Sequence, residues 1–284
     1  MYPAQLLVIG LQMSILLGGG VPVSFDRETF RLPVMRVQDM VAGFALRPGL
    51  DCSTGWAGDD WCETTQPKPW KTYGLVLIGR LLTRLEADLP NFVRTVKANG
   101  FTSLYRYTHG TRRDPDGSHT RVLDLGGWVS YMDRTINITD LLVDRMPAQY
   151  IRPDFDLRQA AILHELAHAY AGAGSVPEEF LDMTGWARDG AGSWVMDEQG
   201  MRESELKLKH AGEKAESWPQ LRDPGVVGLP GPDPDQKRRF PTLYSMESPA
   251  ECFAEIVAYV YFDRDVSDYL DARIIRWIRT NVLN

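Results

Sequence analysis

Apolar residues recur at helical spacing between Tyr73 and Leu85, and this pattern predicts a helix that Pro90 ends. A shorter helix is expected over Asn91–Lys97, because the turn-forming pair Asn99-Gly100 follows it. The front of the domain is therefore expected to be helical, with strands beginning only after residue 100.

Short runs of strand-forming residues come next. They predict four β-strands, over residues 101–108, 120–125, 128–131 and 134–138. The Asp114-Pro115-Asp116-Gly117 sequence has the chemistry of a hairpin turn, so we expect the first two strands to pair with each other.

A second group of helices is predicted in the C-terminal half. The pattern over Asp156–Ala171 predicts a helix with Gly172 as its natural end. A short helical piece at Pro177–Asp182 and a hairpin between Trp186 and Trp194 follow. The remaining elements are a solvated helix, a long proline- and glycine-rich loop and two final helices, at 201–215, 218–241, 249–262 and 267–278. A helical front, a small mixed or antiparallel sheet and then more helices predict an α+β fold.

The composition is that of one large globular domain behind a lead-in. The chain has 284 residues, of which 44% are hydrophobic and 24% charged. We expect residues 71–284 to form the domain and residues 26–70, with scattered Pro, Gly and Trp, to be an irregular N-terminal segment. The net charge is −7 and no basic stripe stands out, so nucleic acid is not an expected partner.

Residues 1–25 are interpreted as a signal peptide or as an apolar lead-in that belongs to the mature fold. Leu6–Leu17 is almost wholly apolar and is followed by three glycines, a stretch too short to predict a stable membrane span. The first 26 residues contain no Lys or Arg, which a secretory signal ordinarily has. Cys52 and Cys62 could close a small disulfide loop, which would suit an exported protein, or could remain two free thiols.

The sequence His164-Glu165-Leu166-Ala167-His168 carries the clearest chemistry in the chain. Four residues advance a helix by a little over one turn, so both imidazoles leave the same face and can meet one metal ion. Glu165 projects roughly 100° further around the helix, beside the metal, where a general base would stand. The pattern is typical of zinc peptidases, and the alternative is a helix with two hydrogen-bonded core histidines.

Catalytic zinc ordinarily takes three protein ligands, so a third is expected outside this helix. Two common arrangements are missing. The position where a metzincin has histidine is Gly174, and no Asn-Glu-x-x-x-Asp-like sequence lies between Ser175 and Gly200. His210 is surrounded by charged residues, and Glu178 and Asp182 belong to the start of a short helix, where acidic residues are favoured anyway.

Glu251 is the best candidate for the third ligand. The predicted helix opens at Ser248-Pro249, and Glu251 and Glu255 are four residues apart on one face of it. Glu251 could ligate zinc while Glu255 accepts the free N–H of a ligating histidine. The alternative is a capping box, in which Glu251 only closes the start of the helix and Glu255 is a surface charge.

The segment Tyr244–Glu255, with the His-Glu-Leu-Ala-His helix before it, resembles the anthrax lethal factor-like zincins, which include the Pro-Pro endopeptidases. That family has a tyrosine seven residues before a glutamate that opens an E-x-F-A-E helix, as Tyr244 and Glu251-Cys-Phe-Ala-Glu255 do here. The resemblance covers roughly residues 155–262. The stretch between His168 and Glu251 is longer than the family pattern, so no cleavage specificity is carried over.

The resemblance implies a zincin-like catalytic domain with a defined set of site residues. Its ligands to Zn²⁺ would be His164, His168 and Glu251. Glu165 would be the general base, Tyr244 would donate its hydroxyl to the oxyanion, and Glu255 would support a ligating histidine.

Taken together, these features predict a zinc-dependent metalloendopeptidase with a peptide or protein substrate. The strand at Arg134–Ile138 is a candidate edge on which an extended substrate could pair. Two alternatives stay open: a zinc-dependent hydrolase of a non-peptide substrate, and a catalytically inactive zincin-like binding module.

Overall fold

The computed structural model describes residues 41–48, 69–107, 110–113, 119–122, 126–145, 156–172, 176–203, 237–242 and 244–284. These ranges cover most of the expected domain and part of segment 26–70. The sequence predicts that this segment is irregular, with strands only after residue 100, but Ala45–Pro48 is a strand of the main sheet because it pairs with Ser103–Arg106, a contact distant in sequence. The segment interpreted as a signal peptide lies outside these residues. So do Cys52, Cys62 and residues 218–236 of the predicted loop. Within the described ranges, no helix combines the length and the apolar character that crossing a bilayer requires.

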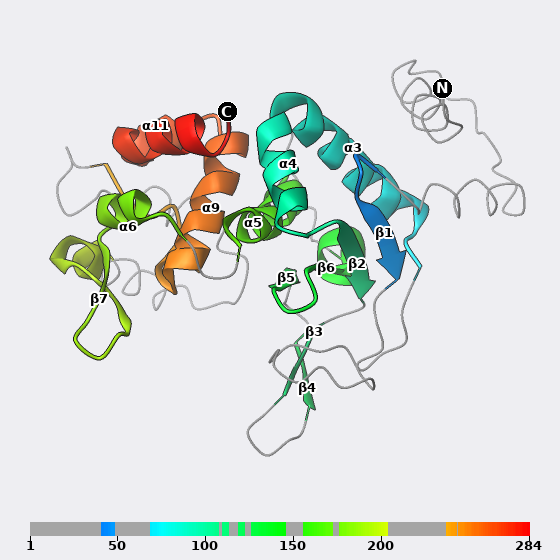
Figure 1. Ribbon diagram of the computed structural model, residues 1–284, viewed down its shortest axis with the longest axis horizontal. Coiled ribbons are helices and arrows are strands. Elements are labelled where there is room, and N and C mark those ends of the chain that lie inside the picture. Colours follow the sequence, from blue (N-terminus) through cyan, green and yellow to red (C-terminus); the bar gives the residue numbers. More distant parts are fainter. Residues whose placement is uncertain are drawn as a thin grey trace, which may run out of the picture.

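The main sheet has four strands in the order β1-β2-β6-β5 and mixes both pairing directions. β1 (Ala45–Pro48), β2 (Ser103–Tyr107) and β6 (Thr135–Thr139) run parallel to one another, and β5 (Gly127–Ser130) pairs antiparallel with β6. With helices packed around it, this mixed sheet gives an α+β fold, the predicted class (Figure 1).

The predicted pairing of strands 101–108 and 120–125 is wrong. β3 (Gly110–Arg113) and β4 (His119–Val122) form a separate antiparallel pair, in which Arg113 lies opposite His119. A hairpin turn pairs the residues that flank it directly, so the strand before the turn is β3. β2 is left to pair with β1 and β6, which are distant in sequence.

The expectation that Arg134–Ile138 forms a sheet edge is also wrong. β6 covers this segment and is hydrogen-bonded to β2 on one side and β5 on the other. All five residues of β6 are buried, as a central strand requires. Among the described strands, β5 is the edge next to β6.

The predicted helices form close to their expected positions. α3 (Thr72–Asp88) and α4 (Pro90–Ala98) lie at the front of the domain, and α5 (Leu157–Ala171) ends at Gly172. α6 (Glu178–Thr184) is followed by the predicted hairpin of β7 (Trp186–Arg188) and β8 (Trp194–Met196). Residues 198–203 are helical, and the rest of the solvated helix predicted at 201–215 lies outside the described residues.

The last predicted helix is in fact two. α10 (Val266–Tyr269) and α11 (Ala272–Asn281) are separated at Leu270–Asp271. The cause is a tertiary contact: the backbone N–H of Asp271 donates to the Arg238 carbonyl over 2.7 Å, and Arg238 N–H donates to the Tyr269 carbonyl over 2.8 Å. The Asp271 side chain then caps α11 by accepting from Arg273 N–H.

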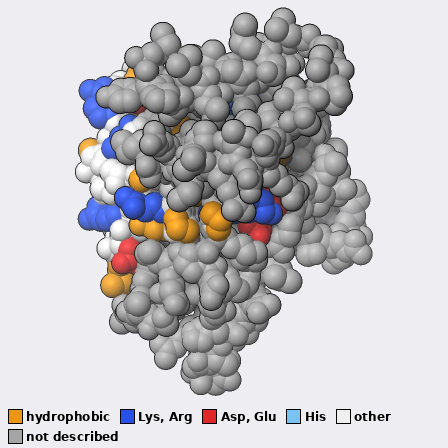
Figure 2. All heavy atoms as spheres, turned by 90° about the vertical axis from the view of Figure 1, so that its right-hand side faces the viewer, with side chains coloured by type: hydrophobic (Ala, Val, Ile, Leu, Met, Phe, Trp, Pro, Cys, Tyr) orange, Lys and Arg blue, Asp and Glu red, His pale blue; other side chains and the backbone are white. Residues whose placement is uncertain are grey.

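The hydrophobic core lies between one face of the sheet and the helices. Leu104, Ile136 and Ile138 on that face are fully buried and belong to the same cluster as the apolar residues of α3 and α5. α9 (Pro249–Phe262) packs alongside α5, with ten of its residues buried (Figure 1). On the face that Figure 2 shows, the described hydrophobic, basic and acidic side chains are intermixed.

Candidate metal centre

α5 brings its two histidines to one face because it is a regular, well-capped helix. The Asp156 carboxylate accepts from the Arg158 N–H over 3.0 Å at its start, and Gly172 ends it with φ 70°. His164 and His168 are both buried, at 5% and 8% exposure. Their rings lie edge to face, with centroids 4.7 Å apart.

α9 supplies the third donor from its first turn. The Ser248 hydroxyl accepts from the Glu251 N–H over 3.2 Å, so Ser248 is the N-cap that the sequence predicts. The Glu251 carboxylate does not turn back to close a capping box. It extends toward α5, where one oxygen contacts both histidines.

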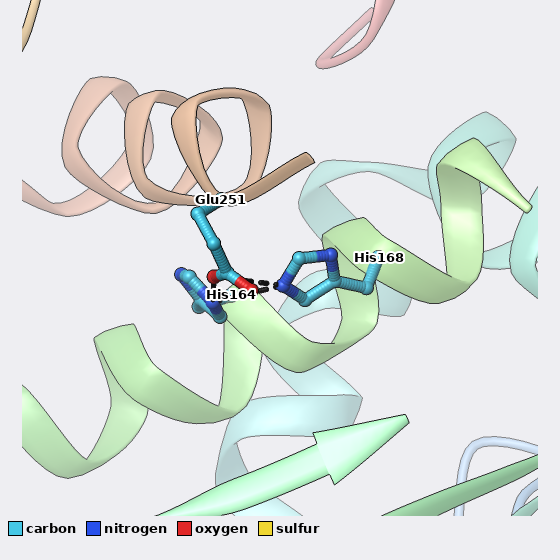
Figure 3. A group of neighbouring side chains, drawn as sticks. All are labelled: His164, His168 and Glu251. Atoms are coloured by element: carbon cyan, nitrogen blue, oxygen red, sulfur yellow. Dashed lines mark hydrogen bonds and ion pairs between the residues drawn. The ribbon is translucent and has the colours of Figure 1, made fainter. Parts of the chain in front are cut away.

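The three side chains converge on one point (Figure 3). Glu251 Oε2 lies 2.9 Å from His164 Nε2 and 3.2 Å from His168 Nε2, and the two Nε2 atoms are 3.0 Å apart. Ligands about 2.0–2.1 Å from one tetrahedral ion are separated by roughly 3.3 Å, close to these distances. The cluster could therefore hold a metal ion. Among the described residues, it is the one group of His, Cys, Asp or Glu side chains close enough together to do so.

The charges in the cluster favour a cation. Burial alone would lower the pKa of His164, but its contacts with Glu251 and Glu255 outweigh burial and raise that pKa well above its ordinary value. Burial would raise the pKa of Glu251, but His168 and His164 outweigh it and hold the pKa below its ordinary value. The carboxylates that favour a proton on His164 would equally favour a metal ion among these side chains.

Glu255 lies behind His164, on the far side from the point of convergence. Its Oε1 is 3.2 Å from His164 Nδ1, within ion-pair distance, although their relative orientation is not that of a hydrogen bond. Its Oε2 accepts from the Thr242 hydroxyl over 2.7 Å. Glu255 is 3% exposed and is therefore a buried charge and not a surface one.

Glu165 lies against the edge strand of the sheet. A Cβ placed on Gly127 of β5 would stand 3.0 Å from Glu165 Cγ and 3.2 Å from its Oε1, so only glycine lets the strand approach this closely. Burial raises the pKa of Glu165, an effect opposed by His164 and His168. A carboxyl with a raised pKa beside these candidate metal ligands is suited to accept and return protons.

Tyr244 lies on a short 3-10 helix, η5 (Tyr244–Met246), directly before α9. Its ring centroid is 5.7 Å from that of His164, and the rings are tilted by 33°. Burial, with a further contribution from the charge of Glu251, raises the pKa of the Tyr244 phenol, so it stays protonated and able to donate a hydrogen bond.

The other candidate ligands that the structure describes do not join the cluster. Glu178 and Asp182 are exposed on α6, and His210 lies outside the described residues.

Three residues near the site were not found from the sequence: Gly127, Thr242 and Tyr131. Burial raises the pKa of Tyr131, and the charges of Glu165 and Glu251 add to this. None of the three belongs to a recognisable motif, so only the fold brings them to attention.

Comparisons of the chain with family models, with curated proteins and with solved structures found no match. The interpretation of this site therefore depends on the side chains that meet in it and on their chemistry.

Proposed function

We propose that this protein is a zinc-dependent metalloendopeptidase. The observation that carries the proposal is the convergence of two imidazoles from α5 and one carboxylate from α9 within 3.2 Å of each other, next to the buried carboxylate Glu165. Two histidines and a glutamate are a ligand set of catalytic zinc, which keeps one position open for water. A structural zinc site is more often closed by four protein ligands and has no need of a base.

The identity of the metal follows from the donors. Imidazole nitrogen suits zinc, copper, iron and nickel, whereas calcium and magnesium sites are built mainly of oxygen ligands. Two of the three donors here are imidazoles. A bound zinc ion would supply Lewis acidity, which lowers the pKa of water and polarises a carbonyl group.

The chain's own residues would move the protons and stabilise charge. Glu165 would take the proton of the attacking water and return it to the leaving amine nitrogen. Tyr244, protonated and near His164, would donate a hydrogen bond to the oxyanion that forms on the scissile carbonyl. Glu255 would hold the His164 ring through Nδ1, the role that carboxylates commonly have behind ligating histidines.

A peptide substrate is supported by the neighbourhood of β5. This strand is an edge among the described strands, and its Gly127 lies against Glu165. An extended chain that pairs with the outer edge of β5 would pass beside the general base. The edge of β5 replaces the segment Arg134–Ile138 as the candidate strand for substrate pairing, because the backbone of that segment is paired on both sides.

The resemblance to the lethal factor-like zincins supports the same proposal and a zincin-like fold. Three of the residues that carry it, His164 and His168 of α5 and Glu251 of α9, meet at one point. Tyr244 of η5 lies beside them, with its ring centroid 5.7 Å from that of His164. The region between α5 and α9 includes the β7–β8 hairpin, so substrate preference is not part of the proposal.

The test compares the wild type with Glu165→Gln, using zinc content and cleavage of a peptide library as readouts. Glu165→Gln should retain zinc and cleave at least about 100-fold more slowly, the range in which a general base contributes. The control is Glu86→Gln on α3, whose side chain is 52% exposed, and it should behave as the wild type. Equal cleavage by zinc-loaded wild type and Glu165→Gln would refute the mechanism. Zinc binding without any peptide cleavage would favour a non-peptide hydrolase or a binding module.

A further inference from the structure

One buried hydroxyl, that of Thr242, touches two parts of the candidate site. It donates to Glu255 Oε2 over 2.7 Å and accepts from the Ser245 N–H over 3.0 Å. Thr242 is 1% exposed, so these bonds form away from bulk water. A hydroxyl has one donor and can accept as well, so a single group can serve both partners.

The hydrogen bond to Glu255 connects Thr242 with His164, a candidate metal ligand. Glu255 is a buried carboxylate with one oxygen 3.2 Å from His164 Nδ1 and the other on Thr242. A carboxylate held at one oxygen has a defined orientation of the other, and that second oxygen faces the ring of a ligand. Loss of the Thr242 hydroxyl would leave Glu255 Oε2 without this donor in a dry site.

The hydrogen bond from Ser245 connects Thr242 with the neighbouring residue Tyr244. Thr242 and Ser245 hold each other reciprocally: the Ser245 hydroxyl donates to the Thr242 carbonyl over 2.6 Å and accepts from the Thr242 N–H over 3.3 Å. Ser245 is fully buried. The turn that these bonds close carries Tyr244 at the start of η5, so the place of the phenol depends on it.

We propose that Thr242 is a positioning residue that sets the His164 ring and the Tyr244 phenol together. It acts on the ring through Glu255 and on the phenol through Ser245. The role of the phenol rests on the proposed peptidase function, whereas the role toward His164 requires only that the cluster binds zinc. The alternative is a threonine that merely stabilises the turn.

The experiment first measures zinc affinity, by competition with a chromogenic chelator, so that no substrate is needed. Thr242→Val keeps the shape of the side chain and removes the hydroxyl. It should weaken zinc binding by about 10–100-fold, as losses behind a ligating histidine do. Thr242→Ser restores the hydroxyl and should bind zinc within about twofold of the wild type. In a Glu255→Gln background, the effect of Thr242→Val on zinc affinity should be smaller, because the two residues act in series.

Ser245→Ala separates the effect of Thr242 on Tyr244 from its effect on His164. Ser245 contacts Thr242 but not Glu255 in the described hydrogen bonds, so this variant loosens the turn and leaves the carboxylate held. Zinc affinity should remain that of the wild type, while kcat on a cleaved peptide falls. Thr242→Val should also cost less in kcat when Tyr244 is already Phe than when it is Tyr, because the phenol it would misplace is gone.

Wild-type zinc affinity in Thr242→Val, with thermal unfolding showing a folded protein, would overturn the proposal. So would losses in kcat that add fully between Thr242→Val and Tyr244→Phe. If the wild type binds zinc but cleaves no peptide, the peptidase function fails, and the zinc comparison still decides the role of Thr242 toward His164.

Discussion

Gly127→Ala tests whether the edge strand and the proposed base touch as the structure describes. The added Cβ would stand 2.7 Å from the Asn137 backbone oxygen, 3.0 Å from Glu165 Cγ and 3.2 Å from Glu165 Oε1. Gly127 is not among the glycines with positive φ, so alanine is compatible with the backbone conformation and the cost is steric. The nearest atom is backbone and cannot rotate away, so β5 must move or Glu165 must shift.

Two magnitudes follow from these distances. Overpacking of this kind costs about 1–3 kcal/mol of unfolding free energy, which corresponds to a Tm lower by roughly 2–12 °C. Displacing a catalytic group by about 1 Å can cost on the order of 100-fold in rate, or about 2.7 kcal/mol in the activation barrier. Zinc content should change little, because the three proposed ligands come from α5 and α9 and not from β5.

The assay combines thermal unfolding, zinc content and kcat for a peptide that the wild type cleaves. The matched control is Gly190→Ala in the turn of the β7–β8 hairpin, where a Cβ would meet nothing within 4 Å. It should leave all three readouts unchanged. A Gly127→Ala protein with wild-type Tm and wild-type kcat would show that β5 does not approach Glu165 in this way.

Three further outcomes are expected. Glu251→Gln should weaken zinc binding by at least the roughly 10–100-fold that changes behind a ligand cost, and a chelator titration that finds no loss would exclude Glu251 as a ligand. Zinc at about 100 times its Kd should stabilise the metal-free protein by about 2.7 kcal/mol, seen as a Tm higher by roughly 5–11 °C in scanning calorimetry, and no shift would contradict a site formed in the folded state. Asp144→Asn should destabilise the fold by about 1–3 kcal/mol near neutral pH, because Asp144 Oδ2 lies 2.6 Å from the fully buried Arg106. Burial opposes the charge of Asp144, but Lys71 and Arg106 outweigh burial and lower its pKa, so its contribution is present above the ordinary aspartate pKa of about 3.9 and is lost as pH falls through the lower folded value. Urea unfolding at pH 7 and near pH 3 should therefore show a difference between wild type and Asp144→Asn that shrinks at the lower pH, and an undiminished difference would contradict this account.

Local elements of this protein could be predicted because they depend on neighbours in sequence. The apolar spacing before Pro90 predicts α3, and Gly172 predicts the end of α5. The β7–β8 hairpin follows from its flanking tryptophans and the glycines between them. Each of these predictions depends on residues that are close to one another in the sequence.

Pairing and interruption could not be predicted, because they depend on contacts between distant segments. β2 and β6 are separated by the β3–β4 hairpin and by β5, yet they pair in parallel at the centre of the sheet. The break between α10 and α11 arises from Arg238, which hydrogen-bonds across Leu270. Within residues 267–278 the local signal is Asp271, a favoured N-cap residue, but the contact with Arg238 is not encoded there.

The site divides in the same way. The sequence by itself determined that His164 and His168 share a face and that Glu165 stands beside them, because a helix has a fixed angle per residue. The sequence left two interpretations of Glu251, as a residue that caps the helix or as a metal ligand. Packing of α9 against α5 decided between its directions, since the Ser248 cap uses the Glu251 N–H and leaves the carboxylate to reach the histidines.

Only the tertiary structure decided what surrounds that cluster. Gly127 matters because a strand from another part of the chain passes against Glu165, and Thr242 matters because the turn before η5 lies beside Glu255. Their roles come from distances between segments that a linear pattern does not encode. Helix geometry sets the direction of each candidate ligand on α5 and α9, and the packing of these two helices sets the point at which the side chains meet.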